Sequence, residues 1–256
     1  MKLEFHTAEK VKTYRKKLKQ HHLNNLIDDE DAVNQILSFL FEFDQKSEKS
    51  VLMGKEEDEI TDDIRDWLDK YEDFNFSGFK VDSQVKNRNR NQEGYYDLKF
   101  QHSDWEGAFY FECKRMDETK TMTTEYVYRP ATERTKADGG LYRFLINKYA
   151  DANKDFGGMI GFVIKGAVKN VIDNVKDKIS DLKITENKIK FGQSTNPKLL
   201  EQTISGNKNT FLSQHVRCDK TVNKIISPVL IYHIFFDFTQ TKKNPSGQKT
   251  NAKGVI

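Results

Sequence analysis

The runs YYDLKFQH (residues 95–102) and AFYFECKRM (residues 108–116) both alternate polar and apolar side chains. A period of two is typical of β-strands, because successive side chains of a strand point to opposite faces of its sheet. The five residues between the runs, SDWEG at 103–107, are typical of a hairpin turn. We therefore predict an antiparallel β-hairpin over residues 95–116.

This hairpin is predicted to gather charged side chains on one face. A turn centred on residues 105–106 places Asp97 opposite Lys114 and Lys99 opposite Glu112. A slip of one residue would move the two carboxylates to different faces. The other face is predicted to carry the apolar side chains of Tyr96, Leu98, Phe100, Phe111 and Cys113.

Helical and strand patterns alternate on both sides of the hairpin. The helices, marked by apolar residues three and four apart, are predicted at 31–44, 56–71, 140–153 and 168–179. The further strands are predicted at 79–85, 159–164 and 227–238, with irregular structure over 181–210 and a loop at 213–215. His233, inside the last strand, is predicted to be an interior histidine with its hydrogen bonds satisfied. This order predicts an α/β fold with a mixed central sheet flanked by helices on both faces.

Charge is distributed unevenly along the 256 residues, although the net charge is only +3. Residues 1–22 hold seven Lys or Arg and two Glu, and we predict a basic helical arm over 1–24. Residues 23–73 hold 17 acidic and five basic residues, a net charge of −12. Residues 241–256 hold four Lys and no acid, which predicts a disordered basic tail after a main domain at 25–240.

Several classes of protein are not indicated by the sequence. No run approaches the ~18 apolar residues of a membrane helix, and the first residues lack the apolar centre of a signal peptide, so we expect a cytoplasmic protein with no membrane association. Two cysteines, Cys113 and Cys218, cannot form a disulfide framework. No GxxxxGK[ST] phosphate loop occurs, so ATP-driven movement is not expected.

The charged face of the hairpin has two interpretations. Asp97 and Glu112 supply hard oxygen ligands, which suit Mg²⁺ or Mn²⁺ together with water and substrate phosphate. Alternatively, the two carboxylates pair with Lys99 and Lys114 as ordinary ion pairs on a half-exposed sheet.

The arrangement Tyr96-Asp97-Leu98, hairpin, Phe111-Glu112-Cys113-Lys114 resembles the signature of the PD-(D/E)XK nucleases, which have the restriction-endonuclease-like fold. The proline that precedes the aspartate in that superfamily is replaced here by Tyr96. The superfamily also carries an acid on the helix before the sheet. We match it to Glu57, whose stripe continues through the apolar residues of helix 56–71, with Glu59 as the second choice.

The resemblance implies a metal-dependent phosphodiesterase with a restriction-endonuclease-like core. Asp97, Glu112 and the backbone carbonyl of Cys113 would hold Mg²⁺, or Mn²⁺, with Lys114 and Glu57 completing the catalytic set. The helix after the catalytic strands would direct Arg143 or Lys148 toward the substrate phosphate.

The expected reaction is endonucleolytic hydrolysis of DNA, with RNA as the second choice, in restriction or antiphage defence. Expected partners are a further subunit of a multi-protein defence system or a second copy of the chain. The alternative is a catalytically inactive subunit that binds nucleic acid or another protein.

Overall fold

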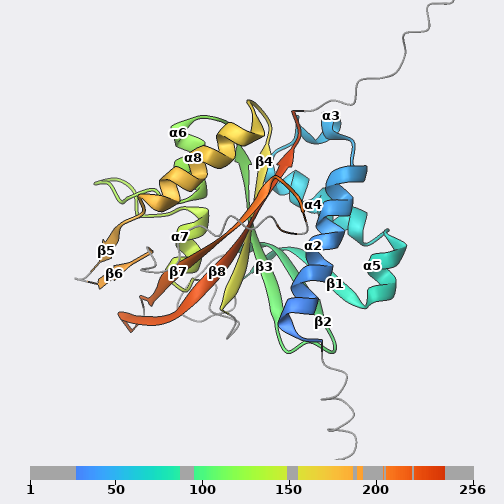
Figure 1. The fold of residues 1–256 in the computed structure, drawn as a ribbon, viewed down its shortest axis with the longest axis horizontal. Helices are drawn as coiled ribbons and strands as arrows, with labels where there is room; N and C mark the ends of the chain where they lie inside the picture. Colours follow the sequence, from blue (N-terminus) through green and yellow to red (C-terminus); the bar gives the residue numbers. More distant parts are fainter. Residues whose placement is uncertain are drawn as a thin grey trace, which may run out of the picture.

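The computed structural model describes residues 27–86, 95–148, 155–186, 189–192, 204, 206–220 and 222–239. At its centre is a six-stranded mixed sheet with the strand order β1-β2-β3-β4-β8-β7 (Figure 1). Strands β3, β4 and β8 are parallel, and the other neighbours are antiparallel. The strands are β1 (Phe79–Lys86), β2 (Tyr95–His102), β3 (Ala108–Met116), β4 (Phe156–Val163), β7 (Thr210–Asp219) and β8 (Lys224–Asp237).

Helices cover both faces of the sheet, as predicted (Figure 1). One face packs against α2 (Asp29–Lys46), α3 (Lys49–Leu52), α4 (Glu57–Leu68) and α5 (Glu72–Ser77). The other packs against α6 (Lys120–Tyr126), α7 (Gly140–Leu145) and α8 (Val168–Ser180), beside the small hairpin of β5 (Ile184–Glu186) and β6 (Ile189–Phe191). None of the described helices is long and apolar enough to cross a membrane.

The helix starts follow from their capping residues. Asp28 accepts a hydrogen bond from the Asp31 N–H at 2.8 Å, which satisfies one of the free donors at the start of α2. At α4, Glu56 and Glu59 form a reciprocal capping box. This box fixes the first turn of α4 and therefore the position of Glu57.

Strand β4 is buried on both faces, and its glycines receive aromatic rings from neighbouring elements. A Cβ at Gly158 would lie 2.2 Å from the Phe111 ring, and one at Gly157 would lie 2.3 Å from the Phe144 ring. The rings therefore pack directly on the β4 backbone. This packing holds β3 on one side and α7 on the other at fixed distances from the central strand.

The hairpin register differs by two residues from the predicted one. The ladder pairs Lys99 with Tyr110 and Phe100 with Phe109, so the predicted pairings of Lys99 with Glu112 and of Asp97 with Lys114 are wrong. The strand and turn bounds are as predicted, but the pairing is centred one residue earlier, and within the turn the Trp105 N–H bonds back to the carbonyl oxygen of His102 at 3.2 Å. A register shift by an even number of residues leaves each side chain on the same face of the sheet.

Two other predictions are corrected. Helix α7 ends at Leu145, eight residues earlier than predicted, and Asn147 takes the left-handed conformation (φ +57°) that commonly follows a helix end. Residues 213–215 belong to strand β7, not to a loop. The predicted helical arm at 1–24 and tail at 241–256 lie outside the described residues.

The core between the sheet and α2, α3, α4 and α5 is here called the first core, and the core between the sheet and α6, α7 and α8 the second core. Strand β7 has no clear apolar alternation because its polar residues hydrogen-bond to each other inside the second core. The Ser213 hydroxyl lies 2.7 Å from Nε2 of His233 and 2.7 Å from Nε2 of His215. His233 Nδ1 lies 3.1 Å from the Tyr126 hydroxyl, and His215 Nδ1 lies 2.6 Å from the Gly192 carbonyl. The prediction that His233 is a satisfied interior histidine is confirmed.

The Gly192 carbonyl sets the direction of this hydrogen-bond chain. A carbonyl only accepts, so His215 donates through Nδ1 and, being neutral, accepts from the Ser213 hydroxyl at Nε2. Ser213 then accepts from His233 Nε2, which leaves His233 Nδ1 to accept from Tyr126. Burial lowers the pKa of His215 to about 4 and lowers the pKa of His233 still more clearly.

We predict that His215 makes the protein sensitive to acid. Between pH 6.5 and about 4 the unfolded chain binds a proton at His215 and the folded chain does not. Wild type should therefore lose about 1.4 kcal/mol of unfolding free energy per pH unit relative to His215→Gln as the pH falls through this window. Urea denaturation of both proteins at several pH values measures the difference. A difference independent of pH would contradict the prediction.

Candidate active site

Strands β2 and β3 stop pairing with each other at Asp97. Their ladder ends at the pair Leu98 and Phe111, so the following N–H groups of β3 have no β2 carbonyl to bond. Two carboxylates take these donors instead. Asp97 Oδ2 accepts from the Cys113 N–H at 2.6 Å, and Glu57 Oε2 accepts from the Arg115 N–H at 3.0 Å.

A local reversal of side-chain faces accompanies this separation. Gln84 of β1, in the position opposite Asp97, has a left-handed backbone (φ +50°). Beyond it, Val85 packs against the second core, whereas Val81 lies in the first. Tyr96 likewise stacks on Tyr110 in the second core at 4.0 Å, so its predicted place beside Leu98 is wrong. Asp97 therefore lies at the point where β2 twists across the sheet.

Helix α4 brings the third carboxylate to the separated strands. Glu57 is the first residue of α4, and the apolar stripe behind it, including Ile60 and Ile64, is fully buried. The alternative acid, Glu59, is used in the capping box, where it accepts from the Glu56 N–H at 2.8 Å. The structure thus places Glu57, not Glu59, at the hairpin.

Five ionisable side chains form a chain of alternating charge across this region. Lys114 Nζ lies 2.7 Å from Glu57 Oε1 and 3.0 Å from Glu112 Oε1. Arg143 Nη1 lies 2.5 Å from the same Glu112 oxygen, and Arg143 Nε lies 3.0 Å from Asp138 Oδ1. The order is Glu57, Lys114, Glu112, Arg143, Asp138.

Burial makes these charges interact strongly. Glu112 is fully buried, and Asp97 is 7% exposed. Burial, followed by repulsion from Glu112, raises the pKa of Asp97 to about 8. Burial opposes the charge of Lys114, yet Glu112, Glu57 and Asp97 together raise its pKa well above the ordinary value. Two crowded carboxylates that resist joint ionisation are typical of a site that holds a cation.

The remaining predicted site residues lie nearby. Burial and the neighbouring Arg143 lower the pKa of the half-buried Lys148, on which Asp138 and Glu112 act with the opposite sign. The Cys113 thiol is fully buried, and burial raises its pKa, so the residue contributes backbone groups to the site. Arg143 is engaged by carboxylates of the protein itself.

Sequence reasoning missed Asp138. This residue forms two hydrogen bonds with Arg143, Nε to Oδ1 at 3.0 Å and Nη2 to Oδ2 at 3.2 Å. Burial would raise its pKa, but hydrogen bonds from Arg143 and the Gly139 N–H lower it to about 2. The spacing of five residues between Asp138 and Arg143, interrupted by two glycines, was a weak signal because it follows no helical or strand period.

The donor chemistry of this region fits a magnesium or manganese ion. Asp97 and Glu112 offer buried carboxylate oxygens, and Mg²⁺ normally completes its shell with water and phosphate. Within the described part of the chain, no three His, Cys, Asp or Glu side chains already stand as a metal-binding group. A bound ion would therefore use the two carboxylates and the Cys113 carbonyl, and would compete with Lys114 and Arg143 for Glu112.

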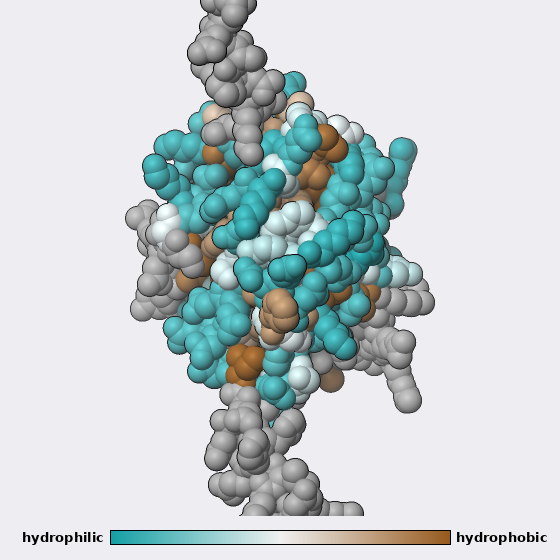
Figure 2. Space-filling view, turned by 90° about the vertical axis from the view of Figure 1, so that its right-hand side faces the viewer, coloured by the Kyte–Doolittle hydropathy of each residue, from teal (hydrophilic) through white to brown (hydrophobic). Residues whose placement is uncertain are grey.

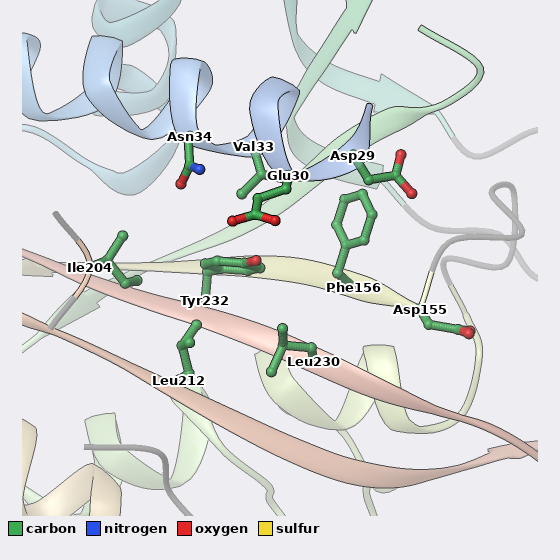
Figure 3. A pocket seen from close by; sticks show the side chains of 10 residues that line it. All are labelled: Asp29, Glu30, Val33, Asn34, Asp155, Phe156, Ile204, Leu212, Leu230 and Tyr232. Atoms are coloured by element: carbon green, nitrogen blue, oxygen red, sulfur yellow. The ribbon is translucent and has the colours of Figure 1, made fainter. Parts of the chain in front are cut away.

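A separate cavity of about 450 Å³ opens between α2 and the strands β4, β7 and β8 (Figure 3). Its rim is acidic and its floor is apolar. Asp155 at the rim is paired with Arg217 at 2.8 Å, and Asp29 accepts from the Trp105 indole at 2.8 Å. No member of the charged chain lines it. The lining residues are Asp29, Glu30, Val33, Asn34, Asp155, Phe156, Ile204, Leu212, Leu230 and Tyr232.

Comparisons with models of protein families, with curated protein sequences and with solved structures find no match to this chain.

We predict that the two hairpin carboxylates affect stability in opposite ways in metal-free buffer. Asp97→Asn keeps an acceptor for the Cys113 N–H and removes the repulsion by Glu112. Because the folded state holds a proton at Asp97 that the unfolded state releases, wild type should lose stability relative to Asp97→Asn as the pH rises from about 4 to about 8.

Glu112→Gln removes the negative charge that pairs with both Lys114 and Arg143. This variant should be less stable than wild type by about 3–5 kcal/mol.

Urea denaturation in EDTA at pH 5 and pH 8 measures both effects. Equal destabilisation by Asp97→Asn and Glu112→Gln at pH 8 would contradict the assignment, because it would make Asp97 an ordinary ion-pair partner.

Proposed function

We propose that this protein is a magnesium-dependent nuclease of the PD-(D/E)XK type that hydrolyses phosphodiester bonds of DNA. The observation that carries the proposal is the meeting of Asp97, Glu112, Lys114 and Glu57 where β2 and β3 separate. The signature predicted these residue types from sequence, and the folded chain joins them from three separate elements.

The order of the elements supports a restriction-endonuclease-like core. An acidic helix, α4, precedes the antiparallel strands β1, β2 and β3, and helix α7 leads into β4, which pairs with β3 in parallel. The superfamily carries an acid on the helix before the sheet, and Glu57 at the start of α4 is the residue we match to it.

Each residue of the site has a distinct role in the proposed reaction. Asp97, Glu112 and the Cys113 carbonyl would hold Mg²⁺, which lowers the pKa of a bound water and offsets negative charge on the phosphate. Lys114, held between Glu57 and Glu112, positions the attacking water and donates to the phosphate oxygens as their charge increases. Glu57 fixes the Lys114 amine and binds the β3 backbone at Arg115.

The charge distribution supports a polyanionic substrate that approaches from the side of α6 and α7. The opposite side, formed by α2, α4 and α5, is largely hydrophilic (Figure 2), and residues 23–73 carry a net charge of −12. DNA is repelled by such a surface. We propose DNA as the substrate, with RNA second, and a cytoplasmic role in restriction or antiphage defence with a further subunit or a second copy of the chain.

A catalytically inactive nucleic-acid-binding or protein-interaction subunit is the second candidate. It is favoured by the state of Glu112, whose Oε1 receives both Lys114 and Arg143. If these cations are permanent counter-ions, the site stabilises the fold and no metal enters it.

We predict that the purified protein cuts plasmid or linear DNA with Mg²⁺ or Mn²⁺ and not with EDTA. Lys114→Met and Asp97→Asn should each lower the cleavage rate by at least about 100-fold, because each removes a group that acts on the reacting phosphate or its metal. Gel assays of DNA and RNA substrates measure the rates.

The matched control is Lys80→Ala, since Lys80 is an exposed lysine of β1 paired with Gln101 and outside the charged chain. This variant should cut like wild type. Undiminished cleavage by Lys114→Met and Asp97→Asn would refute the catalytic assignment. Metal-independent DNA binding without cleavage would favour the inactive subunit.

A further inference from the structure

Residues 129–138, here named the 129–138 arm, form a short ordered hairpin between α6 and α7. Its base is closed by a pair of backbone hydrogen bonds, Arg129 N–H to Asp138 O at 2.7 Å and Asp138 N–H to Arg129 O at 3.0 Å. Its tip is closed by a turn in which the Thr132 N–H bonds to the Thr135 carbonyl at 2.9 Å and the two hydroxyls lie 2.8 Å apart.

The tip of the arm projects from the hydrophobic core, whereas Ala137 at its base packs against the core. Residues 130–136 are all exposed, and none of them belongs to either core cluster. Its exposed side chains include two cations, Arg134 and Lys136, two threonine hydroxyls and a single acid, Glu133. Neither cation has an ion pair among the described residues. A hairpin that holds cations and hydroxyls away from the body has the donors that bind phosphate oxygens.

The base of the arm is bonded directly to the candidate active site. Asp138 closes the arm through its backbone and holds Arg143 through both carboxylate oxygens. Arg143 in turn bonds to Glu112 at 2.5 Å. Two ion pairs therefore connect the arm to the carboxylate proposed to hold the metal, and fix the arm beside it.

We infer that the 129–138 arm binds the sugar-phosphate backbone of the nucleic-acid substrate next to the phosphate that is cut. This inference depends on the proposed nuclease function for the nature of the ligand. Arg134 and Lys136 neutralise backbone phosphates, the threonine hydroxyls add hydrogen bonds, and the bridge through Asp138 and Arg143 sets the distance to the site. The contacts are to the backbone, so binding is independent of base sequence.

The experiment measures binding of a fluorescent DNA duplex to wild type, Arg134→Ala/Lys136→Ala and Glu133→Lys in EDTA, where cleavage does not occur. Loss of two phosphate contacts should weaken binding by about tenfold or more at 0.1 M salt and lower the slope of log K against log salt by about 2. Glu133→Lys, which adds a cation to the arm, should strengthen binding and steepen the slope.

Lys70→Ala/Lys80→Ala is the matched control, because it removes two exposed lysines on the side of α4 and β1. It should bind like wild type. The inference is overturned if the arm variants bind like wild type, or if the control loses as much affinity as Arg134→Ala/Lys136→Ala.

The binding and cleavage assays can refute the nuclease proposal and the arm proposal independently of each other. Arm-dependent binding with no cleavage by wild type in Mg²⁺ would refute the nuclease and retain the arm as a nucleic-acid contact. Cleavage that requires Lys114, together with unchanged binding by the arm variants, would refute the arm and retain the nuclease.

Discussion

Two backbone donors of β3 organise the whole site. Where β2 turns away, the N–H groups of Cys113 and Arg115 would be left unpaired in a buried region, which is unfavourable by about 1–3 kcal/mol for each group. Asp97 and Glu57 satisfy them with carboxylate oxygens. Burial, followed by repulsion from Glu112, raises the pKa of Asp97 to about 8. The separation of the two strands therefore brings two further acids beside the buried negative charge of Glu112.

That negative charge requires cations, and the fold supplies them from two directions. Lys114 comes from β3 itself and Arg143 from α7 on the second core. Glu112 is fully buried, so removing its charge would leave Lys114 and Arg143 without the carboxylate that they share, which is destabilising. Glu112 thus has two cation partners in the metal-free protein, and in the proposed nuclease a metal would have to compete with both of them.

Local patterns predicted the hairpin strands and the gathering of their charged groups, because alternation and a short turn depend on residues close in sequence. These patterns failed where contacts between residues far apart in the sequence determine the structure. The pairing of the hairpin is centred one residue earlier than predicted, and Tyr96 stacks on Tyr110 in the second core and not beside Leu98. Mutual hydrogen bonds allow Ser213 and His215 to lie in a buried strand. Asp138 could not be assigned because its role depends on the place of Arg143 in the folded chain.

The position of Asp138 links recognition to chemistry by a physical argument. Its side chain neutralises Arg143, and its backbone closes the 129–138 arm. Displacing the arm would move Asp138 and alter how much of the Arg143 charge is available to Glu112. In the proposed nuclease, a substrate phosphate held by the arm and a metal held by Glu112 would therefore act on the same guanidinium. Coupling of this kind needs no large motion, because a shift of about 1 Å in a buried ion pair changes its Coulomb energy substantially.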